Sequence, residues 1–214
     1  MNIFEIFYEN RDYDTSVPMT KYLKDKFAFL GIKKPERTAL SKEFLKERKK
    51  DEEVDWKFIF TCFDLPEREF HYLAMDYMAV VKNLFTPADM PNIEKLIVTK
   101  SWWDSIDPIA NIVGHISLAY PEIKEGVLLK WVTANSIWLN RVSIIFQVKL
   151  KDKTDVEFLS NAIVKNSDTL ERFKNKAIGT ALRTYSRTDP DWVREFLANN
   201  EIQSSSEKEA SKYL

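Results

Sequence analysis

The chain has 214 residues, of which 44% are hydrophobic and 30% charged. A chain of this size buries about 70% of its unfolded surface, so its composition excludes a disordered protein and predicts a packed core. The formal net charge of −1 excludes any argument for nucleic-acid binding from global charge, so such a role must depend on local basic patches.

Few residues of the types that carry redox or metal chemistry are present. Cys62, the single cysteine, excludes an intrachain disulfide and fits a reducing compartment. It lies in an apolar run, where we expect a buried side chain rather than a nucleophile. His71 and His115 are too few to build a His/Cys metal site, so we expect none. We find no signal-peptide pattern and no apolar run of membrane-spanning length, and expect a cytoplasmic protein.

The predicted elements begin with a short apolar helix at residues 3–8. Residues 9–17 contain Asp12 and Asp14 and lack helical periodicity, which predicts a loop. From there on, prolines precede periodic segments and predict helix starts, because proline lacks the N–H that a first helical turn leaves unpaired. These prolines are Pro18, Pro35, Pro66, Pro91, Pro108, Pro121 and Pro190.

Apolar residues recur at spacings of three and four, which is the helical period. After Pro66 they are Phe70, Leu73, Ala74, Tyr77, Met78 and Val81; around Glu171 they are Leu170, Phe173, Ala177, Ala181 and Leu182. The run at 142–150 fits a buried helix better than a strand. The last residues, from Ser204, predict a short final helix with Ser204 to Ser206 as possible N-caps.

The predicted segments have about 10 to 17 residues and short joints, which indicates stacked helical hairpins of the HEAT type with a period near 40. The expected fold is an all-α superhelical solenoid of HEAT-like repeats, in one domain over residues 1–214. An irregular all-α domain is the alternative.

Six stretches, in order over nearly the whole chain, resemble the HEAT-like-repeat alkylpurine DNA glycosylases, the AlkD family of DNA alkylation repair proteins. They are PMTKYLKDKFAFLGIKKPER, DLPEREF, LIVTKSWWDSID, IWLNRVSIIFQVK, NKAIGTALRTYSRTDPDWV and EKEASKYL. The resemblance implies a solenoid whose concave basic face holds duplex DNA. It also implies hydrolysis of the N-glycosidic bond of cationic alkylpurines, without metal or cofactor and without flipping the base into a deep pocket.

The same resemblance assigns roles to four residues. Asp107 matches the catalytic carboxylate, which would stabilise an oxocarbenium-like sugar and direct a water. Trp103 matches an aromatic wall, whose π face attracts a cation with about 0.5–2 kcal/mol. Arg141 matches an arginine that anchors a phosphate, and Tyr22 a tyrosine of the DNA-contacting N-terminal region.

Two of these four residues have a structural alternative. Asp107 could be the N-cap of a helix that starts at Pro108, and Tyr22 could belong to the core. We expect Trp102 in the core and Asp104 in solvent. The remaining tryptophans, expected to be packing residues, are Trp131, Trp138 and Trp192.

Two positions depart from the family pattern. Thr180 stands where active members carry a second tryptophan after KAIG, and a threonine offers no π face. The segment between the first helix and PMTKY is shorter than in the glycosylases, and its acidic residues would repel phosphate.

Two basic stripes nevertheless support DNA binding. Residues 33–50 hold eight Lys or Arg against three Glu, and Lys176, Thr180, Arg183 and Arg187 fall on one helical face.

These observations favour a monomeric DNA alkylation repair relative with weak, salt-sensitive duplex binding and little or no excision. An active glycosylase for 3- or 7-alkylpurines is the first alternative, and a protein-binding helical solenoid is the second.

Overall fold

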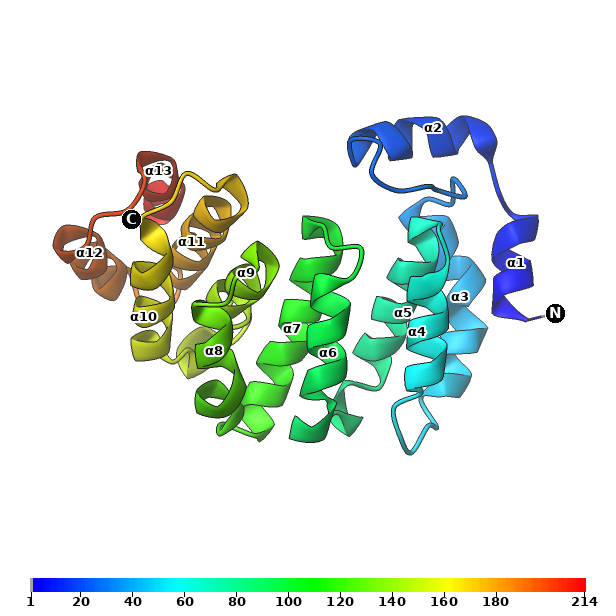
Figure 1. Ribbon diagram of the computed structural model, residues 1–214, viewed down its shortest axis with the longest axis horizontal. Helices are drawn as coiled ribbons and strands as arrows, with labels where there is room; N and C mark the ends of the chain where they lie inside the picture. Colours follow the sequence, from blue (N-terminus) through cyan, green and yellow to red (C-terminus); the bar gives the residue numbers. More distant parts are fainter. Residues whose placement is uncertain (1) are drawn as a thin grey trace. The chain divides into compact units, whose positions relative to one another are not determined.

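The computed structural model describes residues 2–214, and within them every regular element is a helix (Figure 1). The predicted all-α fold is confirmed. The described chain divides into two compact units, unit 1 ending at Phe85 and unit 2 spanning Thr86–Leu214. The prediction of a single domain over the whole chain stays a prediction.

Unit 1 is built around a helical hairpin of α4 and α5, with α3 packed on α5 and α1 on α3. Its elements are α1 (Ile3–Glu9), α2 (Tyr13–Tyr22), α3 (Lys34–Arg48), α4 (Trp56–Asp64), α5 (Arg68–Val80) and η1 (Lys82–Leu84). The apolar face predicted after Pro66 is fully buried in α5 and its C-cap. Cys62 is also fully buried, as expected.

The loop predicted at residues 9–17 is wrong, because α2 begins at Tyr13. Asp12 is the N-cap of this helix, and its carboxylate accepts hydrogen bonds from the Thr15 N–H and hydroxyl, at 3.1 and 2.9 Å. Asp14 lies in the first turn, where a negative charge is favourable. The acidic residues that suggested a loop are therefore the residues that start the helix.

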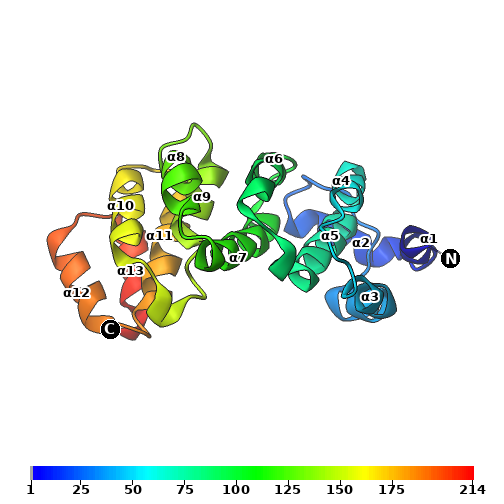
Figure 2. The same cartoon turned by 90° about the horizontal axis from the view of Figure 1, so that it is seen from below.

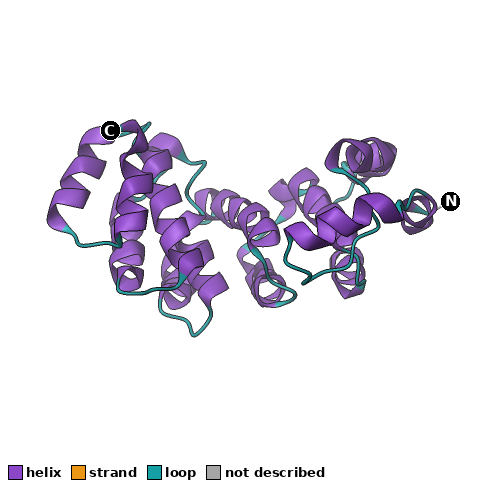
Figure 3. Ribbon diagram, turned by 90° about the horizontal axis from the view of Figure 1, so that it is seen from above, coloured by secondary structure: helices purple, strands orange, loops and turns teal. Residues whose placement is uncertain are grey.

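Unit 2 consists of helical hairpins whose second helices, α7, α9, α11 and α13, pack on one another in succession (Figure 2). Its elements are η2 (Pro87–Asp89), α6 (Met90–Val98), α7 (Trp103–Ala119), the π-helical η3 (Lys124–Leu128), α8 (Leu129–Val132), α9 (Ile137–Ile145), η4 (Lys151–Lys153), α10 (Val156–Ser167), α11 (Arg172–Tyr185), α12 (Pro190–Asn199), α13 (Ser204–Ala210) and η5 (Ser211–Tyr213). Successive hairpins begin at residues 90, 124, 156 and 190, so the repeat is 32 to 34 residues rather than near 40. Short loops join the helices (Figure 3).

Several local predictions in unit 2 need correction. Pro108 lies inside α7 and does not start it. Leu170 precedes α11 and is 90% exposed, outside the apolar face expected of that helix. The final helix exists, but its N-cap is Gln203, and the Ser206 hydroxyl instead donates to the Asn175 carbonyl at 2.9 Å. The buried helix expected at 142–150 ends at Ile145 and continues as turns.

No described helix has the length and apolar character that a membrane crossing requires. Residues 2–214 likewise contain no group of three or more His, Cys, Asp or Glu side chains arranged to hold a metal ion.

Candidate functional site around Asp107 and Arg141

The predicted site begins where the chain turns from α6 into α7. Lys100 has a left-handed backbone, with φ of 46°, and the Ser101 hydroxyl donates to the Ile97 carbonyl at 2.6 Å. This turn ends α6 and lets α7 start at Trp103, five residues before Pro108. The sequence TKSWWDSID therefore places both aspartates within the first turns of a helix.

Helical spacing puts Trp103, Asp107 and Asn111 on one face of α7, since residues four apart lie one above the other. Asp107 is the fifth residue of the helix. The N-cap alternative is therefore wrong: Trp102 occupies that position, without a side-chain cap bond. The Asp107 side chain is thus available for tertiary contacts.

Asp107 makes a two-bond ion pair with Arg141 of α9. The arginine Nε donates to Oδ1 and Nη2 donates to Oδ2, both at 2.8 Å. This fork geometry matches the guanidinium to both carboxylate oxygens and is among the stronger protein ion pairs. The two residues, 34 positions apart in sequence, therefore form one unit.

The two partners differ in their access to water. The Arg141 side chain is 6% exposed and that of Asp107 is 41% exposed. Arg141 also donates from Nη1 to the Phe173 carbonyl, in the first turn of α11, at 2.9 Å. The guanidinium is consequently held by α7 and α11 at once, while the carboxylate is the solvent-facing member.

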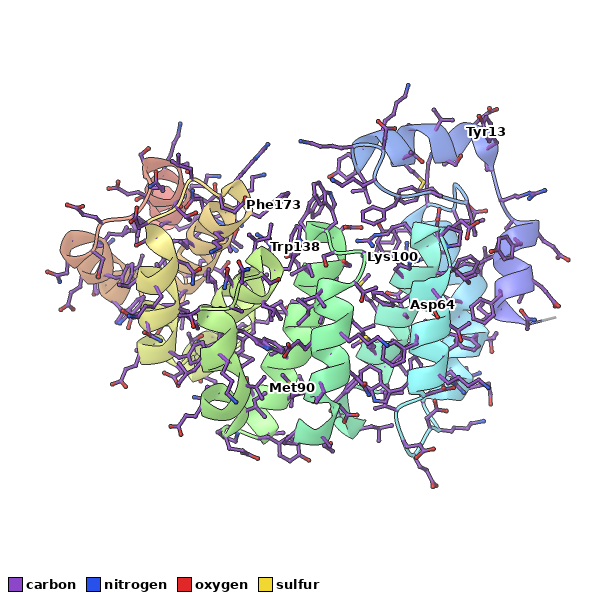
Figure 4. All side chains as sticks on the ribbon, in the orientation of Figure 1. Tyr13, Asp64, Met90, Lys100, Trp138 and Phe173 are labelled. Carbon is purple, nitrogen blue, oxygen red and sulfur yellow. The ribbon has the colours of Figure 1, made fainter. Side chains whose placement is uncertain are left out.

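Three half-buried aromatic side chains lie beside this pair. Trp102, Trp138 and Phe173 form a triangle with ring centroids 4.9 to 5.9 Å apart. Trp138 and Phe173, labelled in Figure 4, belong to the first turns of α9 and α11. The prediction of Trp102 as a core residue is therefore wrong, because its side chain is only half-buried. Trp138 packs against other rings, as predicted, but is not fully buried. Partly exposed rings next to an ion pair form a surface suited to a flat or cationic ligand.

Asn111 adds an unusual polar group one turn beyond Asp107. Its Nδ2 donates to the Asp107 carbonyl at 2.9 Å, while its Oδ1 is buried with no hydrogen-bond partner among the described residues. Unsatisfied buried acceptors are uncommon, because each loses its hydration without compensation.

The predicted basic stripe on α11 is largely engaged within unit 2. Arg183 forms an ion pair with Glu209 of α13. Arg187 lies in the turn after α11, with its guanidinium 4.0 Å from the centroid of the Tyr213 ring. Lys176 is exposed, and Thr180 is half-buried on α11.

The remaining predicted residues belong to unit 1. Tyr22 is the last residue of α2 and is 72% exposed, so the core alternative is wrong. It borders an open hollow of about 410 Å³, together with Phe29, Lys33 and Tyr72.

In the stripe at 33–50, the two arginines are neutralised by aspartates. Arg37 pairs with Asp76 at 3.4 Å, and Arg48 pairs with Asp51, at 3.3 Å, and with Asp55.

Phe173 and the ring contacts of Trp102 and Trp138 were not predicted as parts of the site. Phe173 contributes its main-chain carbonyl, which no side-chain pattern marks. Two tryptophans at neighbouring helix starts were a usable signal, but their meeting depends on how α7 and α9 pack.

The sequence profile of the DNA alkylation repair enzyme family matches residues 4–214. No curated protein matches the chain. A solved structure described as a predicted DNA alkylation repair enzyme from Enterococcus faecalis is similar, with 32% identity and a TM-score of 0.88. The match covers 95% of this chain and 96% of that one. The family profile and the similar structure each match nearly the full length of the chain. The chain therefore belongs to the DNA alkylation repair enzyme family.

Proposed function

We propose that this protein is an AlkD-type member of its family that binds duplex DNA weakly and excises alkylpurines little or not at all. Family membership supports DNA as the ligand. Some of the basic side chains predicted for phosphate contact are already engaged, since Arg183 and Arg48 are paired with carboxylates. A monomeric state and a cytoplasmic location stay predictions.

The observation that carries the proposal is the two-bond contact between Arg141 and Asp107. Excision needs an uncompensated negative charge near the sugar, where positive charge develops as the N-glycosidic bond breaks. A guanidinium at 2.8 Å from both carboxylate oxygens offsets much of that charge. The same contact occupies the arginine that was predicted to anchor a phosphate.

Thr180 supports the proposal independently. A hydroxyl and a methyl group replace the indole expected there from the family resemblance, and neither attracts a cationic base or sugar as a π face does. Trp103 would then be the single aromatic wall of the lesion site among the residues carried over from the family.

The test measures release of 7-methylguanine and 3-methyladenine from methylated duplex DNA. We expect wild-type release near the rate without protein. Robust release that Asp107→Asn abolishes and Asp104→Asn preserves would contradict the proposal, since both variants remove one charge from the start of α7.

Duplex binding is measured separately by fluorescence anisotropy with a labelled oligonucleotide. We expect weak binding at 50 mM salt that is lost near 200 mM, because few phosphates are neutralised and counterion release is salt-dependent. An absence of binding at 50 mM salt would favour the protein-binding solenoid instead.

An active glycosylase with a different lesion range is the second candidate, favoured by the solvent-facing Asp107 carboxylate. In that case Thr180→Trp changes which methylated base is released, while the wild type already turns over. An inert wild type on several alkylated bases would exclude this candidate.

A further inference from the structure

Surface hollows lie along α10 in unit 2, away from the residues discussed above. They are two open hollows of about 510 and 590 Å³ that share Glu157 and Asn161. Residues 121–129, including η3, border the first hollow, and α12 borders the second. Neither Asp107 nor Arg141 lines them. We call these two hollows the α10 groove.

The charges around the α10 groove are predominantly negative. The residues lining it include four glutamates without an ion pair among the described residues: Glu122, Glu125, Glu157 and Glu195. The one cation in the lining, Lys124, is already paired with Asp155. Elsewhere in the chain, carboxylates such as Glu209 and Asp107 are matched by arginines.

Two asparagines at the α12 end of the groove present acceptors as well. Asn199 and Asn200 use their side-chain N–H groups on the carbonyls of Glu195 and Phe196, at 3.0 and 2.9 Å. Their amide oxygens are therefore left to accept hydrogen bonds from another molecule. Carboxylate and amide oxygens together select a ligand that is rich in donors and positively charged.

Apolar side chains accompany these acceptors along the groove. Leu129 is 40% exposed and Val164 is 46% exposed. Trp192 lines the second hollow and stacks on Phe196, with ring centroids 5.3 Å apart. A ligand complementary to this surface carries apolar groups between its positive charges.

We propose that the α10 groove binds a segment of a partner protein in which Lys or Arg alternates with apolar side chains. Alternating apolar and cationic groups match the exposed aliphatic side chains and the unpaired glutamates, while the glutamates repel phosphate and so exclude nucleic acid. The proposal does not depend on DNA binding or excision, because the residues involved are different.

The test uses the full chain and a fluorescein-labelled peptide of Lys, Leu and Ser, titrated at 50 mM salt and followed by anisotropy. Glu157→Gln, which changes a residue common to both hollows, should weaken binding about two- to fivefold, as the loss of an exposed ion pair predicts. The double variant Glu157→Gln/Glu195→Gln should weaken it further. Glu52→Gln, an exposed glutamate in unit 1, should leave affinity unchanged.

A second comparison separates docking from diffuse charge attraction. Val164→Ser should weaken binding of the Leu-containing peptide and leave a control peptide with Ser in place of Leu unaffected. Equal weakening by Glu52→Gln and Glu157→Gln, or unchanged affinity in the double variant, would overturn the proposal. So would comparable binding of a peptide with Glu in place of Lys. Circular dichroism on each variant verifies that the helices are intact.

Discussion

The Asp107–Arg141 pair combines a buried cation with a half-exposed anion, and this asymmetry decides how each residue responds to substitution. Arg141 is 6% exposed, so water cannot replace its carboxylate partner. Removing one member of a buried pair leaves the other charge uncompensated, which is more harmful than the pair itself is stabilising.

We therefore expect Asp107→Asn to lower the free energy of unfolding by about 1–3 kcal/mol, since an amide oxygen retains one hydrogen bond but no charge. Urea unfolding followed by circular dichroism measures the change. Asp104 is half-buried rather than exposed as predicted, and Asp104→Asn, which removes a charge from the same helix but leaves the two-bond pair with Arg141 intact, should change the free energy of unfolding less. Equal stability of both variants would show that the ion pair contributes little.

The sequence identified Asp107 and Arg141 as separate functional residues but did not predict that they pair. Pairing requires that α7 and α9 present the two side chains to each other, which is a property of helix packing and not of either motif. The third contact, from Arg141 to the Phe173 carbonyl, involves a main-chain atom, so residue types alone cannot predict it. The roles assigned to these residues by family resemblance stay predictions.

At the scale of elements, the C-terminal α13 depends on a close approach to α11 at Gly179. A Cβ added there would lie 2.8 Å from the Glu209 Cβ and 3.1 Å from the Ser206 carbonyl oxygen. Gly179→Ala should therefore push the helices apart and destabilise the protein by about 1–3 kcal/mol.

Gly126 provides a matched control for this substitution, because a Cβ there would meet nothing within 4 Å. Gly126→Ala should be neutral or stabilising by up to about 1 kcal/mol, since alanine favours helix more than glycine does. Thermal unfolding of the two variants side by side measures both effects, and the same response from both would contradict the packing argument.

The contact between α11 and α13 should also depend on pH. Hydrogen bonding to Lys212, with a further contribution from Arg183, lowers the pKa of Glu209 below its ordinary value of 4.5. A lowered pKa in the folded state means that the ion pairs contribute stability above pH 4.5, and that the contribution is lost as pH falls through the lowered value.

Glu209→Gln should accordingly be less stable than the wild type at pH 7, by under about 1 kcal/mol, and the difference should vanish at acidic pH. Urea midpoints measured from pH 3 to pH 7 test this. A difference that stays constant with pH would mean that shape, and not charge, accounts for the effect.

Helix existence was more predictable than helix boundaries. The apolar face of α5 followed directly from spacings of three and four. Residues 9–17 lack helical periodicity and so predict a loop, whereas Asp12 and Asp14 stabilise the N-terminus of α2. Pro18 and Pro108 predict helix starts, yet both lie inside helices, α2 and α7. Each is the sixth helical residue, so the helix begins before the proline and not at it.

At the scale of the whole molecule, the sequence predicts one domain and the contacts divide the chain into two compact units. A single domain should unfold in one cooperative transition. Trp56 is the one tryptophan of unit 1, and the other five belong to unit 2. Fluorescence of the Trp56→Phe variant therefore reports on unit 2 alone.

We expect the fluorescence transition of Trp56→Phe in urea to coincide with its circular-dichroism transition, which follows the helices of both units. Trp138→Phe is the matched control, since it removes one indole from unit 2 and keeps the unit 1 signal. Two separated transitions would show that the chain folds as two domains.

The all-α class was predictable because apolar residues recur at the helical spacings of three and four and prolines precede the periodic segments. The repeat length was not predictable from the sequence. The repeat of 32 to 34 residues results from short helices such as α8, which spans only Leu129–Val132. The turns that shorten each repeat depend on tertiary packing.

The complete burial of Cys62 has a consequence for a protein of this family. Burial, with a smaller contribution from Asp55, raises the pKa of the Cys62 thiol well above its ordinary value. Thiolates are the protein groups that react fastest with electrophiles, and the reaction requires both ionisation and access. The Cys62 sulfur has neither, so the reagents that methylate DNA bases would leave it intact.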